Sequence, residues 1–233
     1  MFRARTLDWQ EWVHGAARVG RVVSKHGLRG TLRLAAWRVS RLAYVREEYV
    51  WYRLDIQRDR VRIRLPRHVS VIRGRRADVD ALGALPTIGP RKARRRLDEG
   101  AELWIANHLG RVVSACWIYR RRTPALAATS GWVDLPPGTV GLEDSVTSDE
   151  FAGSILASAV WSAVAGALAE QGVQAIVTKV EETNLPCRRA IERAGFHAVA
   201  SMQLQRIGGR ARVDLRLHEE MSAAAFLAAQ FAR

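Results

Sequence analysis

The sequence predicts an α/β (α+β) fold in which a mixed, mostly antiparallel central sheet is flanked by helices, with an N-terminal helical extension. Apolar residues alternate with period two in several runs, as they do in half-buried strands, and these runs surround a long Ala-rich helical stretch at 153–171. The 233 residues suffice for one domain with a proper core and a smaller addition. We therefore expect an extension at 1–48, the main domain at 49–218 and a helical tail at 219–233.

The extension is expected to contain two basic amphipathic helices within residues 8–46. Asp8 can cap the first helix and Thr31 the second, and Gly27 separates them. One interpretation is that their apolar faces pack on the domain that follows, as amphipathic helices usually do. The other is that the Arg and Trp side chains lie at the surface of an anionic membrane.

The excess of positive charge lies in the first part of the chain. The formal net charge is +14, and residues 1–100 hold 24 Lys and Arg against 10 Asp and Glu, whereas residues 101–233 hold 13 of each. A local excess of this size attracts anionic partners such as membrane surfaces, nucleic acids or phosphorylated ligands. We do not expect nucleic acid, and peripheral contact with an anionic membrane stays open.

The cysteines and the N-terminus suit a cytoplasmic protein, and peripheral attachment to the inner membrane face stays open. Cys116 and Cys187 form no CxxC or Cys/His cluster, so we expect neither a disulfide framework nor a metal site. Acidic residues interrupt the place where a cleaved leader would be apolar. The uncharged run Phe151–Ala169 has 19 residues, but its Ala, Ser and Gly content favours a buried helix over a membrane span.

Alternation predicts a hairpin over Tyr49–Leu65, ended by Pro66, and a short strand at His68–Arg73. The other expected elements are helices at Val79–Leu85 (capped by Asp78) and Pro90–Leu97, strands at Glu102–Asn107 and Arg111–Tyr119, a strand within Gly131–Val146 interrupted by Pro136–Gly138, the helix 153–171, a buried strand at Ala175–Val180, a helix at Pro186–Ala194, strands at Phe196–Ile207 and Ala211–Leu217, and a helix at Ala223–Phe231.

The segment Val140–Phe196 predicts a strand–loop–helix–strand–helix unit that can hold a phosphorylated ligand. Backbone N–H groups in the loop and in the first turn of the long helix have no partners within the helix, and the helix dipole favours an anion there. The candidate ligand-binding residues are Gly153, Ser154, Ile155, Leu156, Ala157 and Ser158.

The segment Asn184–Phe196 resembles a motif of the GNAT acyltransferases, and the likeness extends from about His68 to Leu217. Asn184, the small residue Cys187 at +3 and Gly195-Phe196 at +11 and +12 stand at the expected spacing. The resemblance implies a GNAT-like fold that uses acetyl-CoA or another acyl-CoA and no metal. It also implies that Asn184 and Cys187 lie at the cofactor site, and that a backbone N–H near Val146 polarises the acyl carbonyl.

Three positions depart from the family pattern. Ala152 stands where the loop usually has Gln or Arg, and Ile155 stands where it usually has Gly. Ile191 occupies the +7 position, at which the family often places a tyrosine that acts as general acid, and it cannot donate a proton.

The expected general base is a carboxylate at the end of the strand before the loop, since an attacking ammonium must lose a proton. Glu143 and Asp144 are the first candidates, with Glu143 preferred, and Glu181 and Glu182 come second. Strand alternation predicts that one member of each pair faces the cleft and the other faces away. Simpler roles stay open: the carboxylates can pair with arginines, Asn184 can cap a helix, and Cys187 can fill space.

These observations predict an acyl-CoA-dependent N-acyltransferase, with acetyl as the expected group, that acts directly on an amine of a small molecule such as an amino sugar. Two alternatives remain. One is a catalytically degenerate GNAT-fold binding or assembly module, and the other is an anionic-membrane or nucleic-acid binder that uses the basic N-terminal region. The sequence leaves a homodimer open.

Overall fold

The computed structural model describes residues 44–128, 130–207, 210–218 and 222–231. The chain divides into two compact units, Glu47–Leu204 with Val213–Arg233 and Met1–Arg46 with Gln205–Arg212, and the site described below lies in the first of these. Most of the helical pair predicted at 8–46 lies outside the described residues. The predicted C-terminal end of this helical pair is wrong, because Tyr44–Arg46 already belong to a strand.

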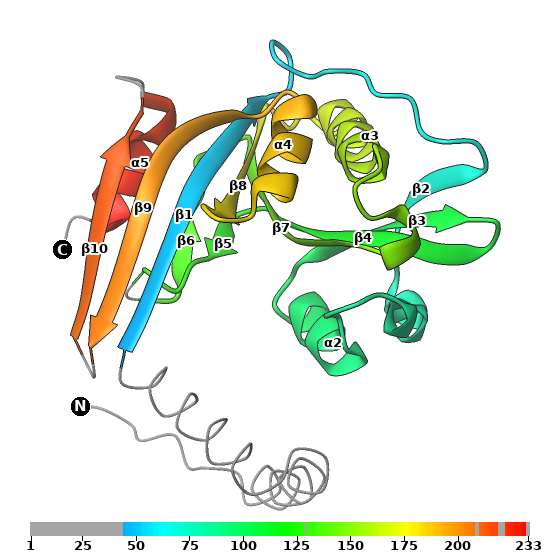
Figure 1. The fold of residues 1–233 in the computed structure, drawn as a ribbon. Coiled ribbons are helices and arrows are strands. Elements are labelled where there is room, and N and C mark those ends of the chain that lie inside the picture. Colours follow the sequence, from blue (N-terminus) through cyan, green and yellow to red (C-terminus); the bar gives the residue numbers. More distant parts are fainter. Residues whose placement is uncertain (1–43, 129, 208–209, 219–221, 232–233) are drawn as a thin grey trace, which may run out of the picture. The chain divides into compact units, whose positions relative to one another are not determined.

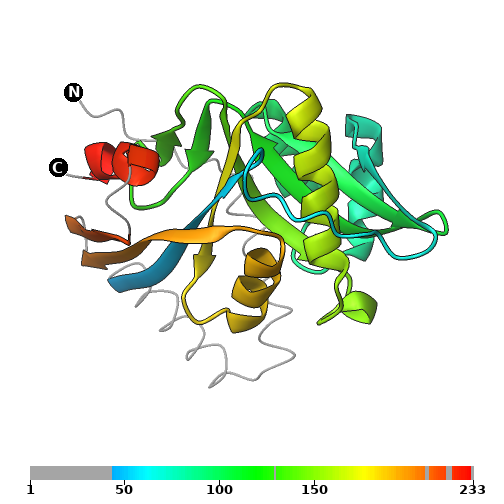
Figure 2. The same ribbon diagram turned by 90° about the horizontal axis from the view of Figure 1, so that it is seen from above.

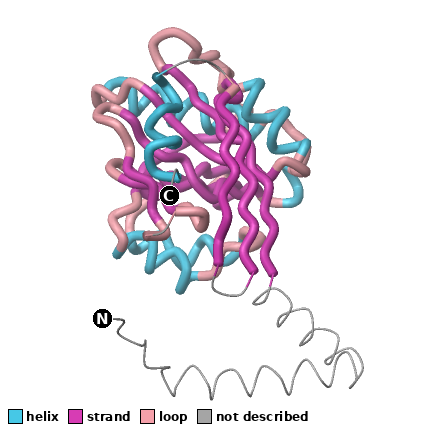
Figure 3. Tube along the Cα trace, turned by 90° about the vertical axis from the view of Figure 1, so that its left-hand side faces the viewer, coloured by secondary structure: helices cyan, strands magenta, loops and turns pink. Residues whose placement is uncertain are grey.

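A sheet of eight strands in the order β10-β9-β1-β8-β7-β4-β3-β2 forms the centre of the fold (Figures 1 and 3). Strands β7 and β8 pair in parallel, whereas β1–β8, β2–β3, β3–β4 and β4–β7 pair antiparallel. This confirms the predicted mixed, mostly antiparallel sheet. The strands of the sheet are β1 (Tyr44–Asp55), β2 (Val69–Arg73), β3 (Glu102–His108), β4 (Arg111–Tyr119), β7 (Thr139–Thr147), β8 (Ala175–Glu181), β9 (His197–Ile207) and β10 (Arg210–Leu217).

Helices cover both faces of this sheet, as alternation along β4 shows. Cys116 and Ile118 belong to one apolar core, which includes helices α3 (Leu156–Glu170) and α4 (Leu185–Arg193). Trp117 and Tyr119 belong to a second core with the 3₁₀ helix η1 (Arg76–Ala84) and helix α2 (Pro90–Asp98). Because successive strand residues point to opposite faces, α3 and α2 lie on opposite sides of the sheet (Figures 1 and 2).

A short hairpin interrupts the chain between β4 and β7. Its strands, β5 (Arg122–Pro124) and β6 (Trp132–Asp134), form a separate two-stranded sheet. A third core joins this hairpin to the C-terminal helix α5 (Ser222–Phe231) and to Trp51 of β1.

The predicted hairpin at Tyr49–Leu65 is wrong in its second half. Only β1 forms a strand, and the segment after Asp55 has no strand partner. Instead, the Ile63 N–H donates to Ser162 Oγ at 3.0 Å, and that hydroxyl donates to the Val61 carbonyl at 2.7 Å. The alternating apolar residues of this segment do make packing contacts, but they pack on a helix and do not form a second strand.

Two helix predictions need smaller corrections. Helix α3 begins at Leu156 and not at 153, because Gly153 adopts a positive φ of 73° in the preceding turn. The helix expected after Asp78 is the 3₁₀ helix η1, in which Asp78 accepts from the Arg75 N–H at 2.6 Å. Within the part of the chain that the structure describes, no helix combines the length and apolar character needed to cross a membrane.

Gly195, which belongs to the Asn184–Phe196 motif, is required by close packing. Its φ is +94°, and a Cβ atom there would lie 2.2 Å from the carbonyl oxygen of Asp59. Asp59 follows β1, so the glycine lets the turn after the N-terminal strand approach the end of α4.

The Gly195→Ala variant should therefore be strongly destabilised, by about 3 kcal/mol, because a backbone clash adds to left-handed strain. Gly172→Ala is the matched control: its φ is +78°, but nothing lies within 4 Å of an added Cβ. We expect the control to lose only about 1 kcal/mol. Urea denaturation measures both, and equal losses would contradict the packing argument.

Candidate active site

A cleft opens where strands β7 and β8 separate. The two strands pair only over Thr139–Gly141 with Ala175–Val177, near their N-terminal ends. Beyond this point lies a cleft of about 480 Å³, which is lined by both strands and by residues of α2, α3 and α4. Among the predicted site residues, the cleft brings together Glu143, Asp144, Val146, Asn184 and Cys187.

A β-bulge in β7 turns both candidate carboxylates toward the cleft. Asp144 has a φ of +43°, and the register with β4 shifts between the pairs Trp117–Glu143 and Ala115–Val146. The prediction that only one of Glu143 and Asp144 faces the cleft is therefore wrong, since the bulge inserts an extra residue. For the second pair, Glu181 and Glu182, the prediction is confirmed, because Glu181 lines the cleft and Glu182 does not.

The bulge is held on its other side by helix α3. The indole Nε1 of Trp161 donates to Ser145 Oγ at 2.8 Å, and Trp161 also lines the cleft. Trp161 is 4% exposed, so this hydrogen bond satisfies a buried donor and fixes the strand against the helix.

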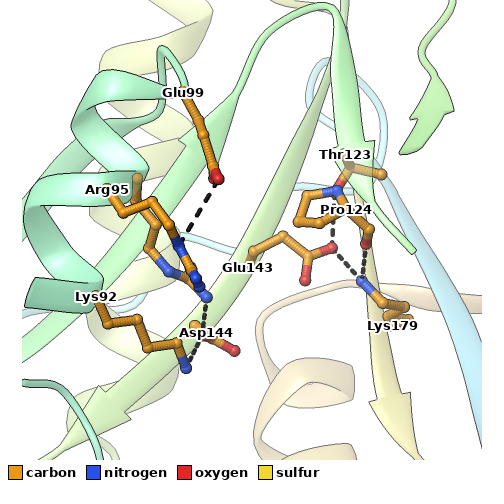
Figure 4. Close-up of polar contacts among 9 residues, drawn as sticks. Lys92, Arg95, Glu99, Thr123, Pro124, Glu143, Asp144 and Lys179 are labelled. Atoms are coloured by element: carbon orange, nitrogen blue, oxygen red, sulfur yellow. Dashed lines mark hydrogen bonds and ion pairs between the residues drawn. The ribbon is translucent and has the colours of Figure 1, made fainter. Parts of the chain in front are cut away.

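Glu143 is buried and fixed through one of its two oxygens (Figure 4). Its Oε1 accepts from Thr123 Oγ1 at 2.7 Å and from Lys179 Nζ at 2.6 Å. Lys179 also donates to the Pro124 carbonyl at 2.6 Å, which ties the β5–β6 hairpin to the same carboxylate. Oε2 has no hydrogen bond to any residue that the structure describes, and Glu143 lines the cleft. The carboxylate is thus oriented with one oxygen left for a ligand.

The close approach of Thr123 depends on Gly141, two residues before the carboxylate. A Cβ atom at Gly141 would lie 2.7 Å from both Cβ and Oγ1 of Thr123. A glycine in β7 therefore makes room for the hydroxyl that donates to Glu143.

Asp144 is occupied by two cations from α2. Its Oδ2 accepts from Lys92 Nζ at 2.7 Å and also from Arg96, whose guanidinium lies 5.6 Å from the Trp117 ring centroid. Burial alone would raise the pKa of Asp144, but the Lys92 hydrogen bond and the Arg96 charge hold this pKa below its ordinary value of 3.8. Asp144 therefore stays ionised and is a poor proton acceptor.

The predicted phosphate-binding residues form the turn before α3 and its first turn. The N–H of Leu156 donates to Ser154 Oγ at 3.1 Å, whereas those of Ala157 and Ser158 have no partner among the described residues. The side chains of Leu156 and Ser158 are fully buried, so only their backbones could meet a ligand. Gly153 and Ile155 are exposed, and none of the six residues lines the cleft itself.

The predicted α4 residues have clear structural roles as well. Asn184 Oδ1 accepts from the Cys187 N–H at 3.2 Å, so Asn184 caps α4. Burial raises the pKa of the Cys187 thiol, which keeps it neutral. Ile191 also lines the cleft, but its side chain is packed in the first core.

Sequence reasoning missed three residues of this site. Lys179 was visible only as the single charge in a buried strand, and Thr123 gave no signal. Tyr49 of β1 also lines the cleft, where burial and the nearby Glu47 and Glu181 raise its pKa, so its phenol stays protonated. The alternation of Val50, Tyr52 and Leu54 that follows it indicated a strand but no site.

Replacing Lys179 by Met tests the buried ion pair. Glu143 would lose its counter-ion while staying buried, which should cost about 3–5 kcal/mol in the free energy of unfolding. The double variant Lys179→Met/Glu143→Leu should recover most of this loss. Arg94→Met breaks an exposed pair with Asp80 and should cost less than about 1 kcal/mol. Denaturant titration reports all three, and a cost for Lys179→Met as small as for Arg94→Met would argue against the pair.

The Asp144→Asn variant tests the depressed pKa of Asp144 through pH. A carboxyl whose pKa is lower in the folded than in the unfolded chain stabilises the fold above the unfolded value, and this contribution disappears as pH falls through the folded value. The stability gap between wild type and Asp144→Asn should be largest above about pH 5 and should shrink below about pH 3. A gap that does not change between these pH values would refute the assignment.

Comparison with known proteins identifies the family. Residues 79–196 match the model of the acetyltransferase (GNAT) family. No curated protein sequence matches the chain. Among solved structures, the chain is similar to a tandem GNAT protein from the clavulanic acid biosynthesis pathway, with 15% identity, a TM-score of 0.53, and coverage of 76% of this chain and 58% of that one.

Two further structures show the same likeness. An acetyltransferase of the GNAT family from Colwellia psychrerythraea has 14% identity and a TM-score of 0.50, with 76% and 61% of the chains covered. A glucosamine N-acetyltransferase region of a fungal multi-domain GH3 β-N-acetylglucosaminidase has 13% identity and a TM-score of 0.50, with 74% and 22% covered. The chain spans less than two thirds of each of these three proteins, and such identities show the fold alone. The family model, by contrast, matches half of this chain, including the bulged strand and the Asn184–Phe196 motif, and the chain belongs to the GNAT acetyltransferase family.

Proposed function

We propose that the protein is an N-acetyltransferase that uses acetyl-CoA and acts on an amine of a small molecule such as an amino sugar. Acyl-CoA-dependent N-acetyltransfer is the general activity of its family. The observation that carries the proposal is the cleft between β7 and β8, in which one oxygen of a buried, oriented carboxylate has no hydrogen bond to a described residue. A glucosamine acceptor is named for one structural neighbour, which makes glucosamine a suitable first substrate to test.

The donor would be held largely by backbone. The N–H groups of Ala157 and Ser158 at the N-terminus of α3 can bind a pyrophosphate, and the helix dipole adds to this attraction. Ala152 offers no side-chain donor at the loop position where the family usually has one. We therefore expect acetyl-CoA binding to depend on the fixed geometry of this turn.

Glu143 is the proposed general base. The acceptor arrives as an ammonium, and Oε2 of Glu143 takes its proton, so that the free amine can attack the thioester carbon. The new C–N bond forms as the C–S bond breaks, the nitrogen loses its second proton to solvent as it becomes an amide, and the sulfur leaves as a thiolate that takes up a proton from solvent. We expect a backbone N–H near Val146 to polarise the thioester carbonyl. Val146 lines the cleft in which this carbonyl would lie. Ile191 cannot supply the final proton.

The Glu143→Gln variant should lose about 10²–10³-fold in kcat, because the amide cannot accept a proton. Its affinity for acetyl-CoA should change little, because glutamine keeps the size of the side chain and the proposed pyrophosphate contacts come from backbone N–H groups of α3. The rate at which CoA thiol is released in the presence of glucosamine measures kcat, and calorimetry measures the affinity for acetyl-CoA. Glu181→Gln, which also changes a carboxylate in the cleft, is the control and should keep most of its activity.

Full activity in Glu143→Gln would rule out the proposed base. Absence of acetyl-CoA binding in the wild-type chain would favour the second candidate, a GNAT-fold binding or assembly module. Three residues that depart from the family pattern, Ala152, Ile155 and Ile191, support that candidate. The third candidate, an anionic-membrane or nucleic-acid binder, rests on the positive charge of residues 1–100, of which residues 1–43 lie outside the described part of the chain.

A further inference from the structure

Three locally unfavourable features meet where helix α2 contacts the bulge in β7. Asp144 adopts a left-handed φ of 43°, which strains a residue that has a side chain. Arg96 is 8% exposed, so its guanidinium has lost most of its contact with water. The Nη1 atom of this guanidinium is also buried without a hydrogen-bond partner among the residues that the structure describes. Strained and unsatisfied groups gather at functional sites, so this contact calls for a functional explanation.

The contact joins one carboxylate to two cations of α2. Asp144 Oδ2 accepts from Arg96 and, at 2.7 Å, from Lys92 Nζ (Figure 4). The two cations are four residues apart, so they lie on one face of the helix. The Lys92 side chain is 42% exposed and that of Arg96 only 10%, so water screens the Arg96 pair much less. Arg96 is therefore the stronger of the two partners that hold Asp144.

Arg96 also lies against the strand that faces the bulge. Its guanidinium carbon is 5.6 Å from the ring centroid of Trp117, which is fully buried. Trp117 pairs with Glu143 in the β4–β7 register, and the register shifts between this pair and the pair Ala115–Val146. Arg96 thus contacts both strands at the point where the bulge begins.

The bulge is held from both faces of the sheet. On the side of α3, Trp161 Nε1 donates to Ser145 Oγ at 2.8 Å, and on the side of α2 the two cations hold Asp144. Glu143 shares a peptide bond with Asp144, so the backbone conformation of Asp144 affects the direction in which the Glu143 side chain leaves the strand. Bulges beside active sites re-aim side chains in this way.

Fold stability alone does not account for a buried arginine at this position. An apolar side chain of similar volume would fill the same space without losing hydration, and such replacements of buried ion pairs are often neutral or stabilising. Ala93 and Leu97, which pack in the second core, show that the inner face of α2 is otherwise apolar. Arg96 does not line the cleft, so its effect on a ligand there must pass through Asp144.

We propose that Arg96 is a positioning residue, which holds Asp144 in its left-handed conformation and thereby aims Glu143 at the acceptor amine. Lys92 supports the same carboxylate from the cleft. This inference rests on the proposed N-acetyltransferase function and adds to it a residue outside the cleft. It makes the orientation of the base depend on the placement of α2.

Hydrogen–deuterium exchange of the full chain without ligand tests the positioning role directly. Arg96→Met removes the charge at similar length and should speed exchange in peptides over Glu143–Thr147 by about tenfold. Its kcat with acetyl-CoA and glucosamine should fall about tenfold, because the base is misaligned. Its affinity for acetyl-CoA, measured by calorimetry, should change little. The matched control is Arg95→Met on the same helix, where the Arg95 side chain is 69% exposed and pairs with Glu99. This control should leave all three quantities unchanged.

A double-variant cycle shows whether Arg96 acts through Asp144. Asp144→Asn should speed the same exchange and lower kcat by a similar factor, and Arg96→Met/Asp144→Asn should be no worse than either single variant. Asp144→Asn breaks the contact from the other side, so it tests the role even if Arg96→Met does not fold. Wild-type exchange at the bulge in either single variant, or losses that multiply in the double variant, would overturn the role. If the wild type does not bind acetyl-CoA, the proposed function fails, while exchange at the bulge still decides the positioning role.

Discussion

The buried ion pair between Glu143 and Lys179 is the interaction on which the site depends. In the parallel register Gly141 lies opposite Val177, so these two residues occupy the next corresponding positions on β7 and β8. Backbone pairing ends at this point, and a side-chain bridge of 2.6 Å continues the connection where the cleft begins. The same pair keeps the strands connected and fixes the orientation of the proposed base.

A buried pair of this kind is stable only if its remaining hydrogen-bonding capacity is satisfied. Thr123 and the Pro124 carbonyl satisfy it from the inserted β5–β6 hairpin, and the Trp51 ring lies 5.5 Å from the Lys179 ammonium. The hairpin, the N-terminal strand and both central strands therefore converge on one carboxylate. The second oxygen of Glu143, which has no hydrogen bond to a described residue, is the group that the arrangement offers to a ligand.

Local patterns in the sequence were enough to predict most of the fold. The strand at Ala175, the helix after Asn184 and the hairpin of β3 and β4 follow from alternation, capping and turn residues. The Asn184–Phe196 spacing also indicated the correct family. The long-range features could not be predicted in this way. Nothing local shows that β1 lies between β8 and β9, or that the segment at Ile63 binds a helix serine.

The candidate site was predicted less completely for the same reason. Glu143 stood out as a carboxylate at the end of a strand, but the bulge at Asp144 is a backbone feature that alternation cannot show. Thr123 and Lys179 are 20 and 36 residues from Glu143 in sequence, so their contacts depend on the tertiary fold. Tyr49 reaches the cleft only because its strand is inserted beside β8.

The central claim is that acetyl-CoA binds in the cleft between the separated strands and at the first turn of α3. Hydrogen–deuterium exchange of the full chain with and without acetyl-CoA tests this claim most directly. We predict slower exchange in peptides that cover Ser145–Ser158 and Asn184–Ile191, and little change in η1. Protection elsewhere with none in these two segments, at acetyl-CoA concentrations that saturate binding, would contradict the account.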